Sequence, residues 1–270
     1  MRRRITLKTP DQVARMRAAG LIVERTLAAV VARVAPGVST AELDEVAAQT
    51  IREAGATPSF LGYQGYPATI CTSVNDQVVH GIPSADQVLA AGDIISVDAG
   101  AILDGWHGDS AVTVPVGEVT ADRLALIRAC EEAMWAGLAA AAPGARLSDI
   151  SAAVESTVRA HGGYGVVEEY VGHGIGRQMH EDPPVPNYGP PGRGPRLVPG
   201  MVLAVEPMIT LGRPDTDLLD DGWTVRTRDG QPAAHFEHTV AVTEAGPVVL
   251  TASDGGAGRL APGRVSPQAR

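Results

Sequence analysis

The chain has 270 residues, of which 44% are hydrophobic and 20% are charged, and its net charge at pH 7 is −9. This balance is typical of a globular protein that is long enough for one large or two small domains with a substantial core. The acidic excess, without a basic stripe that could follow a phosphate backbone, gives nucleic-acid binding no electrostatic support.

The N-terminus and the cysteine content predict a cytoplasmic protein. The basic start Met1-Arg-Arg-Arg4 is typical of a signal peptide, but Lys8 and Asp11 interrupt any apolar run after it. No window reaches the apolar length needed to span a bilayer, so no membrane association is expected. Cys71 and Cys130 fit a reducing compartment and are too few for a thiolate metal cluster.

Four helices are predicted. Thr9-Pro-Asp-Gln12 combines a hydroxyl cap, a proline at the first helical position and a glutamine that can close a capping box. The helix it starts should run to about Val34. A second capping box, Ser39-Thr-Ala-Glu42, starts a helix that should end near Ala54. The third and fourth predicted helices cover residues 120–142 and 148–161.

Residues 94–113 have the pattern of two strands joined at Asp104-Gly105, a dipeptide suited to a tight hairpin turn. If these two residues form the loop, Asp98 opposes Ala111, and Asp98 and Asp109 become diagonal neighbours on one face. Their backbones would be roughly 7–8 Å apart and their carboxylates closer. Two carboxylates this close, among apolar residues, repel each other unless one is protonated or a cation lies between them. A metal site and a solvated strand pair with outward acids are the two interpretations.

The two pairs of helices resemble each other at a constant offset of 107 residues. Pro36-Gly37 matches Pro143-Gly144, and Gly55 matches Gly162. Coincidence in an alanine-rich chain is the alternative. A real repeat would make each half of the molecule a helical hairpin followed by antiparallel strands.

The remaining pattern is mixed α+β. Further strands are predicted at residues 68–74, 202–209, 223–226 and 235–242. Residues 182–195 are so rich in proline that an extended surface loop is expected. The tail 252–270, rich in glycine, proline and arginine, is expected to be disordered.

Three downstream segments offer partners for the two aspartates. Residues 172–180 contain two histidines among glycines, where the backbone can approach an ion closely; a phosphate-binding loop is the rival, but the segment lacks a GK[ST] ending. Residues 205–208 and 235–239 each place one glutamate in an apolar strand. A buried glutamate needs a partner, and salt bridges from distant arginines are the alternative to a metal.

The segments SVDAG, HGDS, GHGIGR, VEPM and FEHT, in this order, resemble the metal-ligand motifs of type I methionine aminopeptidases. The resemblance extends from the first helix to about Thr251. It implies the pita-bread fold, an α+β (α/β) architecture with a pseudo-two-fold repeat of a helical hairpin plus antiparallel strands around a central curved sheet. It also implies that residues 1–251 form one catalytic domain.

The resemblance further implies a centre of two divalent metal ions, Co, Mn, Fe or Zn. Asp98 resembles the bidentate ligand of one ion, and Asp109 and Glu237 resemble the carboxylates that bridge both. His173 and Glu206 resemble the remaining ligands of the other ion.

The implied activity is removal of the initiator methionine from nascent proteins whose second residue is small, through attack of a metal-activated water on the first peptide bond. Glu206 would also transfer protons. His180 would hydrogen-bond the developing oxyanion, and His80 would lie near the scissile amide. The substrate-binding residues implied are His80, His180, Phe60, Tyr63, Tyr66, Cys71, Met179 and Trp223. Without the resemblance, the aromatic cluster among them is equally consistent with core packing.

Three residues depart from the pattern of the family. Phe60 and Met179 stand where other members often carry cysteine and phenylalanine. These two residues are expected to affect the range of side chains that the methionine pocket accepts. His235 stands where many relatives have glutamine, and it is expected either to contact a metal ligand or to face solvent. Cys71 is interpreted as a small pocket-lining residue rather than a nucleophile.

Two alternatives share the fold, namely an Xaa-Pro metallopeptidase of the prolidase type and a non-catalytic binding protein. A binding protein would be expected to lose ligands, and all five positions are present here. The expected partners are the N-termini of nascent polypeptides and, transiently, the ribosome. The protein is expected to act as a monomer.

Overall fold

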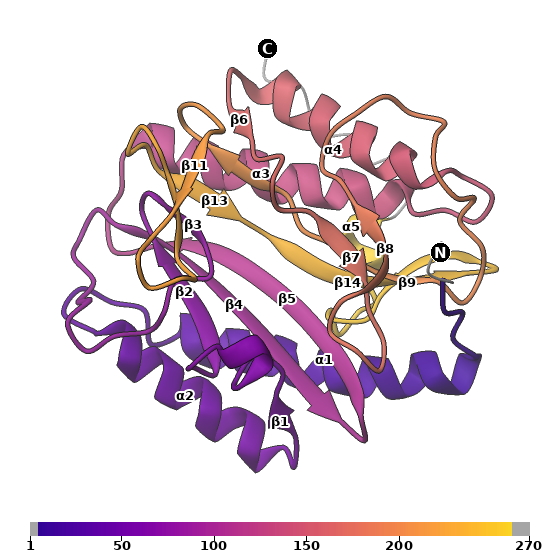
Figure 1. The fold of residues 1–270 in the computed structure, drawn as a ribbon, viewed down its shortest axis with the longest axis horizontal. Coiled ribbons are helices and arrows are strands. Elements are labelled where there is room, and N and C mark those ends of the chain that lie inside the picture. Colours follow the sequence, from indigo (N-terminus) through magenta and orange to yellow (C-terminus); the bar gives the residue numbers. More distant parts are fainter. Residues whose placement is uncertain (1–4, 261–270) are drawn as a thin grey trace.

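A curved antiparallel sheet forms the centre of the molecule in the computed structural model, which describes residues 5–260 (Figure 1). Within these residues the sheet has nine strands in the order β1-β4-β5-β14-β9-β7-β8, with β2 paired to β4 and β15 paired to β14. The strands are β1 (Thr57–Pro58), β2 (Ile70–Val74), β4 (Ile94–Leu103), β5 (Trp106–Pro115), β7 (Gly172–Gly174), β8 (Glu181–Val185), β9 (Val202–Val205), β14 (Glu237–Thr243) and β15 (Gly246–Val249).

Two small sheets of three strands each accompany the central sheet in the described part of the chain. One has the order β13-β10-β6 and the other has the order β11-β12-β3. Their strands are β3 (Gln77–Val79), β6 (Gly165–Val166), β10 (Met208–Thr210), β11 (Thr216–Leu218), β12 (Val225–Thr227) and β13 (Ala233–His235). The strands expected at residues 68–74 and 223–226 are β2 and β12, and each begins two residues later than predicted.

The four predicted helices are present as α1 (Pro10–Val31), α2 (Thr40–Glu53), α3 (Ala121–Ala140) and α4 (Leu147–His161). Both predicted capping boxes are formed, at Thr9 and at Ser39. Helix α1 ends three residues before Val34, because the next backbone N–H groups bond carbonyls three residues back and tighten the chain into a turn. Between residues 5 and 260, no helix combines the length and apolarity needed to cross a membrane.

Each pair of helices covers one half of the central sheet, as Figure 1 shows. Helices α1 and α2 share a buried core with β2, β4 and β5, and α3 and α4 share another with β9 and β14. The repeat is visible in the backbone at its two inter-helix turns. Gly37 (φ 90°) donates its N–H to the Leu89 carbonyl at 2.8 Å, and Gly144 (φ 91°) donates to the Leu197 carbonyl at the same distance. The pseudo-two-fold pita-bread architecture is therefore confirmed.

The central hairpin forms in the predicted register. Asp104 (φ 52°) and Gly105 (φ 74°) adopt the positive φ angles of the turn. Asp98 pairs with Ala111 in the ladder between β4 and β5. Because side chains alternate along a strand, Asp98 and Asp109 share one face of the sheet.

Two strands predicted as continuous are each divided in the structure. Residues 202–209 form β9 and β10, and the break falls at Pro207, which has no N–H to donate to a ladder. Residues 235–242 form the end of β13 and most of β14, with Phe236 between them. Met208 and His235 pair in a separate small sheet. The apolar pattern does not reveal a change of sheet, since both environments are buried.

Two segments expected to lack regular structure are partly ordered. Glu181–Val185 forms β8, which pairs with β7 at the edge of the central sheet, so the predicted surface loop is wrong for residues 182–185. An edge position tolerates the missing proline N–H groups. In the tail, Ala257–Leu260 forms α5, and Arg259 lies 3.2 Å from the Glu131 carboxylate on α3. The remaining residues of the predicted tail, 261–270, lie outside the described residues.

A pair of glycines lets α1 lie directly against the hairpin. A Cβ at Gly108 of β5 would lie 2.6 Å from the backbone nitrogen of Gly20, and one at Gly20 would lie 2.5 Å from the Leu250 carbonyl oxygen. Gly108 faces the helix, so its neighbour Asp109 faces the opposite side of the sheet. The helices and the predicted metal ligands therefore lie on opposite faces of β5.

Gly20→Ala should lower the free energy of unfolding by about 1–3 kcal/mol, because the added methyl group overlaps backbone atoms that cannot move aside freely. Alanine is the better helix former by about 1 kcal/mol, so any loss reports the close packing. Urea unfolding would measure the change. Gly163→Ala is the control, since a Cβ there would meet no atom within 4 Å. A Gly20→Ala variant as stable as the wild type would contradict this account.

Candidate metal centre

Three carboxylates converge on one face of the central sheet. Ala111 of β5 pairs with Asp98 on one side and with Glu237 on the other. Asp109 is two residues from Ala111 and projects from the same face. The Thr239 hydroxyl holds the backbone of Asp109 in place, because it donates to the Asp109 carbonyl at 2.8 Å and accepts from the Asp109 N–H at 3.2 Å.

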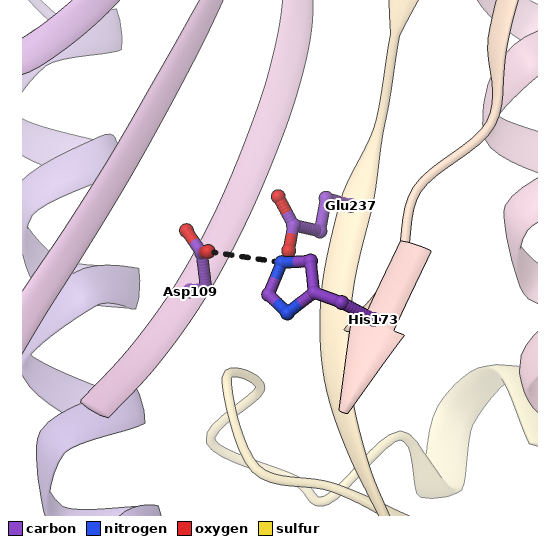
Figure 2. A group of neighbouring side chains, drawn as sticks. All are labelled: Asp109, His173 and Glu237. Atoms are coloured by element: carbon purple, nitrogen blue, oxygen red, sulfur yellow. Dashed lines mark ion pairs between the residues drawn. The ribbon is translucent and has the colours of Figure 1, made fainter. Parts of the chain in front are cut away.

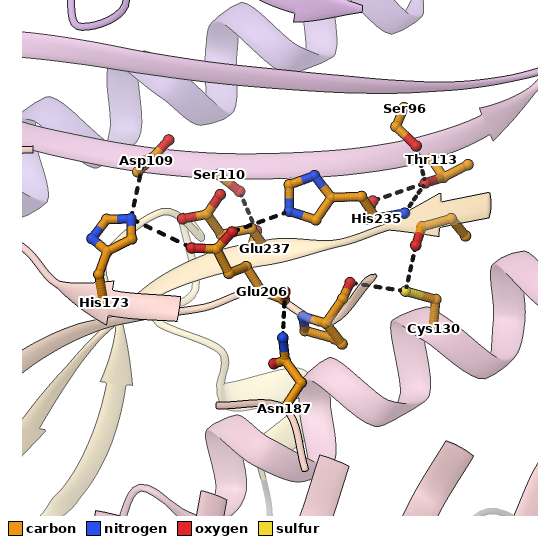
Figure 3. Close-up of polar contacts among 12 residues, drawn as sticks. Ser96, Asp109, Ser110, Thr113, Cys130, His173, Asn187, Glu206, His235 and Glu237 are labelled. Carbon is orange, nitrogen blue, oxygen red and sulfur yellow. Dashed lines mark hydrogen bonds and ion pairs between the residues drawn. The ribbon is translucent and has the colours of Figure 1, made fainter. Parts of the chain in front are cut away.

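The second half of the chain adds one imidazole and one carboxylate. Glu206 directly follows β9, where Val205 pairs with His238, so Glu206 lies beside Glu237. His173 lies in β7, which pairs with β9 on its other side. Figure 3 shows His173, Glu206 and Glu237 converging from these strands toward Asp109. The structure thus brings all five predicted ligands together, four from the strands β4, β5, β7 and β14 and Glu206 from the end of β9.

The spacing around His173 fits a shared ion. Its Nε2 lies 3.8 Å from Asp109 Oδ2 (Figure 2) and 3.4 Å from Glu206 Oε1 (Figure 3), and both distances are longer than an N–H···O hydrogen bond. Two ligands bound to one ion by bonds of about 2.0–2.2 Å stand about 3–4 Å apart. His173 Nδ1 lies 2.9 Å from the Gly174 carbonyl and donates to it, which leaves the lone pair of Nε2 facing the carboxylates.

The cluster contains polar atoms that the protein does not satisfy. Seven buried side-chain polar atoms of residues 5–260 lack a hydrogen-bond partner, and four of them belong to Asp98, Asp109, His235 and Glu237. No lysine or arginine in the described part of the chain forms an ion pair with these carboxylates. The expected alternative of arginine salt bridges is therefore not supported, and this set of oxygens with one imidazole fits a divalent cation.

Burial and mutual repulsion shift the ionisation of the group. Burial raises the pKa of Asp98 to about 7 and that of Glu206 to about 8, and the neighbouring Glu206 charge adds to the Asp98 shift. Burial, and then the charges of neighbouring acids, also raise the pKa values of Asp109 and Glu237. Burial lowers the pKa of His173 to about 3, so its imidazole is neutral and able to act as a ligand.

The metal centre opens into a cavity of about 220 Å³ with an apolar side. Phe60, Tyr66, Cys71 and Met179 pack together there as buried side chains. Burial raises the pKa of Cys71 well above its ordinary value, which keeps it as a thiol and supports a wall rather than a nucleophile. The cavity is lined by every residue predicted for the site and by Gln64: Phe60, Tyr63, Gln64, Tyr66, Cys71, His80, Asp98, Asp109, His173, Met179, His180, Glu206, Trp223 and Glu237.

The two remaining predicted histidines lie at the cavity with aromatic neighbours. His180 Nδ1 lies 2.8 Å from the Tyr63 hydroxyl, and its ring lies 4.3 Å from that of His173. His80 (φ 61°) packs edge-on against Tyr170 at 5.6 Å. Burial lowers the pKa of His80 to about 4 and also lowers that of His180, so both are neutral at pH 7. If the Tyr63 hydroxyl donates to Nδ1, His180 keeps an N–H on Nε2.

Sequence reasoning missed Gln64 and Tyr170 and left His235 open. Gln64 lies in the short 3₁₀ turn η1 (Tyr63–Gly65) with φ 48°, and its only sequence signal is its place between two predicted pocket residues. Tyr170 and His80 are 90 residues apart in the sequence, and only the tertiary fold brings their rings into contact. His235 is 2% exposed and lies beside Glu206, so a solvent-facing position is wrong.

Comparison with known proteins finds similar sequences and structures over nearly the whole chain. Residues 14–244 match the family described as Metallopeptidase family M24. Methionine aminopeptidase 1 of Mycobacterium tuberculosis (strain CDC 1551 / Oshkosh) is 55% identical over 255 residues, which are 93% of this chain and 96% of that protein. The crystal structure of methionine aminopeptidase from Thermotoga maritima matches with a TM-score of 0.90 at 42% identity, covering 92% of this chain and 99% of that one. Prolidase from Pyrococcus furiosus matches at 21% identity with a TM-score of 0.69, over 92% of this chain and 65% of that one, so this likeness concerns the fold alone.

The metal-free protein should lose stability as the pH rises from about 6.5 to about 8.5. The folded pKa values of Asp98 and Glu206, about 7 and about 8, lie above their ordinary values, so the folded state holds protons that the unfolded chain has released. That stability disappears as the pH rises through the folded pKa. The lowered pKa of a buried histidine such as His173 acts in the opposite direction, but only below its ordinary value of 6.5.

Thermal unfolding after chelation would measure this effect. The melting temperature should fall across that pH range, and added Mn²⁺ should raise it more at the upper end than at the lower. Asp98→Asn should make the fall shallower, because one of the titrating carboxyls is removed. A melting temperature that stays constant or rises would rule out this explanation.

Proposed function

The chain belongs to metallopeptidase family M24, and we propose that it is a metal-dependent aminopeptidase that removes N-terminal methionine when the second residue is small. The observation that carries the proposal is the cluster of buried, unpaired carboxylate oxygens beside an apolar cavity. The 55% identical relative named methionine aminopeptidase 1, aligned over nearly its whole length, supports the same activity. A divalent metal is therefore the cofactor of this site.

We propose further that the centre holds two ions, drawn from Co, Mn, Fe and Zn. Asp109 and Glu237 would bridge the ions, Asp98 would bind one of them, and His173 and Glu206 would bind the other. When bound, such ions would supply Lewis acidity and would lower the pKa of the attacking water. The proposal agrees with the arrangement of the donors, since Asp109 and Glu237 lie between Asp98 and the pair His173 and Glu206.

The side chains around the ions would handle the substrate. The methionine side chain would lie against Phe60, Tyr66 and Met179, where an unbranched thioether packs well on aromatic surfaces. Trp223, which stacks edge-on against Tyr66 at 5.1 Å, and Cys71 would complete this pocket together with Tyr63.

The proton transfers would fall to Glu206 and the two histidines. Glu206 would take a proton from the attacking water and deliver it to the leaving amine. His180 would donate a hydrogen bond to the developing oxyanion, because Tyr63 holds its other ring nitrogen. His80 would hydrogen-bond near the scissile amide. Both histidines are kept neutral by burial, so each can donate one N–H without carrying a charge.

We infer that residues 1–251 form one catalytic domain that works in the cytoplasm as a monomer. Its substrates would be the N-termini of nascent polypeptides, met during transient contact with the ribosome. The name of the relatives and the absence of a membrane-crossing helix within residues 5–260 are compatible with this setting.

Neither alternative is favoured. The prolidase match is half as identical as that to the Thermotoga maritima methionine aminopeptidase, 21% against 42%. A non-catalytic binding protein would have no use for four carboxylates that disfavour folding without a cation. All five predicted ligands line one cavity, and Asp109, His173 and Glu237 each bring a ligand atom to within 4.8 Å of the others.

The activity is tested by methionine release from Met-Ala and Xaa-Pro peptides after chelation and stepwise return of Mn²⁺ or Co²⁺. Cleavage restored by metal and confined to the Met peptide is expected. Asp109→Asn should abolish it, and Asp122→Asn, in the exposed first turn of α3, should not. Cleavage of the Xaa-Pro peptide alone would favour the prolidase type, and cleavage of neither, with metal bound, would favour a binding protein.

His180→Ala should reduce kcat by about 10²–10³, because it removes one donor to the oxyanion. Metal content should stay that of the wild type, since His180 is not among the proposed ligands. Steady-state kinetics and metal analysis on the same preparation would test both statements. His161→Ala, a surface change on α4, is the matched control. An unchanged kcat would exclude His180 from the mechanism.

A further inference from the structure

His235 lies inside the metal centre although it is not one of the five predicted ligands. It is the last residue of β13 and only 2% exposed. Its backbone is fixed on both sides by one hydroxyl: its N–H donates to Thr113 Oγ1 at 2.8 Å, and Thr113 Oγ1 donates to its carbonyl at 2.8 Å. Ser96 Oγ lies 2.8 Å from the same hydroxyl and, since that proton is already used, donates to it. The imidazole therefore projects from a rigid base.

The carboxylate of Glu206 lies between two imidazoles that approach its two oxygens separately. Oε1 lies 3.4 Å from His173 Nε2, and Oε2 lies 3.7 Å from His235 Nε2 (Figure 3). His235 Nε2 is buried and has no hydrogen-bond partner among residues 5–260. The two imidazoles thus distinguish the two oxygens, with the predicted metal ligand on one side and His235 on the other.

A carboxylate that binds an ion through Oε1 keeps a second oxygen that still needs a donor. Leaving a buried charged oxygen unpaired costs folding and binding free energy. Within residues 5–260, Asn187 is the only residue whose side chain forms a hydrogen bond with Glu206. It donates to the backbone carbonyl of Glu206 and not to the carboxylate. His235 is thus the donor in reach, and closing from 3.7 Å to a hydrogen bond of about 2.9 Å needs only a small rotation of the glutamate.

We propose that His235 is a positioning residue, whose Nε2–H donates to Glu206 Oε2 and holds Oε1 toward the ion that His173 also binds. This inference rests on the metal centre of the proposed function. Partners of this kind fix the orientation of a ligand and typically change metal affinity by about 10–100-fold when they are removed. His235 would therefore set how tightly the ion shared by His173 and Glu206 is held.

The competing role is direct ligation. Glu206, His235 and Glu237 offer ligand atoms within 4.8 Å of one another, so an ion bound by His235 itself is the alternative that the experiment must separate. The approach of His235 to Oε2, away from the oxygen that faces His173, favours the donor role. A glutamine can supply an equivalent N–H donor, whereas a leucine of similar bulk cannot.

Calorimetric titration of chelated, dialysed protein with Mn²⁺ tests the proposal on the wild type, His235→Leu and His235→Gln. The leucine variant should bind the tighter Mn²⁺ about 10–100-fold more weakly, and the glutamine variant should recover affinity to within about threefold of the wild type. His161→Leu, a surface imidazole paired with Glu132, should bind as the wild type does. Equal melting temperatures of the metal-free proteins would show that the loss is not a folding defect.

Three outcomes overturn the proposal. Affinity of the leucine variant within about threefold of the wild type would mean that His235 does not position Glu206. A shift of the visible absorption bands of Co²⁺ in the glutamine variant would identify His235 as a direct ligand. A wild type that binds no Mn²⁺ would remove the proposed function as well, whereas the first two outcomes leave that function standing.

Discussion

Four carboxylates, those of the buried Asp109, Glu206 and Glu237 and of the half-buried Asp98, lie together on one face of the sheet, and no lysine or arginine of residues 5–260 pairs with them. In a medium of low dielectric constant such groups repel one another and lose their hydration, so they must be protonated or neutralised by a cation. The fold holds them together regardless, through main-chain pairing on both sides of Ala111 and through the Thr239 hydroxyl. The centre therefore destabilises the folded state when no cation neutralises the carboxylates, and it stabilises the folded state when a cation binds.

The internal repeat explains how one chain assembles such a centre. The hairpin that follows the first helical pair carries Asp98 and Asp109. The second half of the chain carries His173 and Glu206. Glu237 lies on β14, the strand that joins the two halves by pairing with both β5 and β9. Because the helices cover the other face, with α1 seated on Gly108, the ligand face remains free to form a cavity.

The apolar and the charged parts of the site are built from the same strands. Cys71 of β2 pairs directly with Asp98 of β4, so a wall of the proposed methionine pocket and a proposed metal ligand are neighbours in one ladder. Tyr63 belongs to the apolar cluster and yet holds His180 through a hydrogen bond. In the proposed function, the groups that bind the methionine side chain and those that orient the reacting bond would therefore support each other directly, as a catalytic site requires.

The local features could be predicted from the sequence: both capping boxes, the turn at Asp104-Gly105 and the register that puts Asp98 opposite Ala111, together with the motifs on which the proposed ligands rest. Each of these depends on residues a few positions apart, where stereochemistry and side-chain alternation suffice. The interruptions of the predicted strands at Pro207 and Phe236 depend on the tertiary structure, because an apolar run has the same pattern whichever sheet it belongs to. The tertiary structure also decided that His235 faces Glu206 rather than solvent, because that contact joins segments whose approach depends on the packing of the whole sheet and not on any local preference.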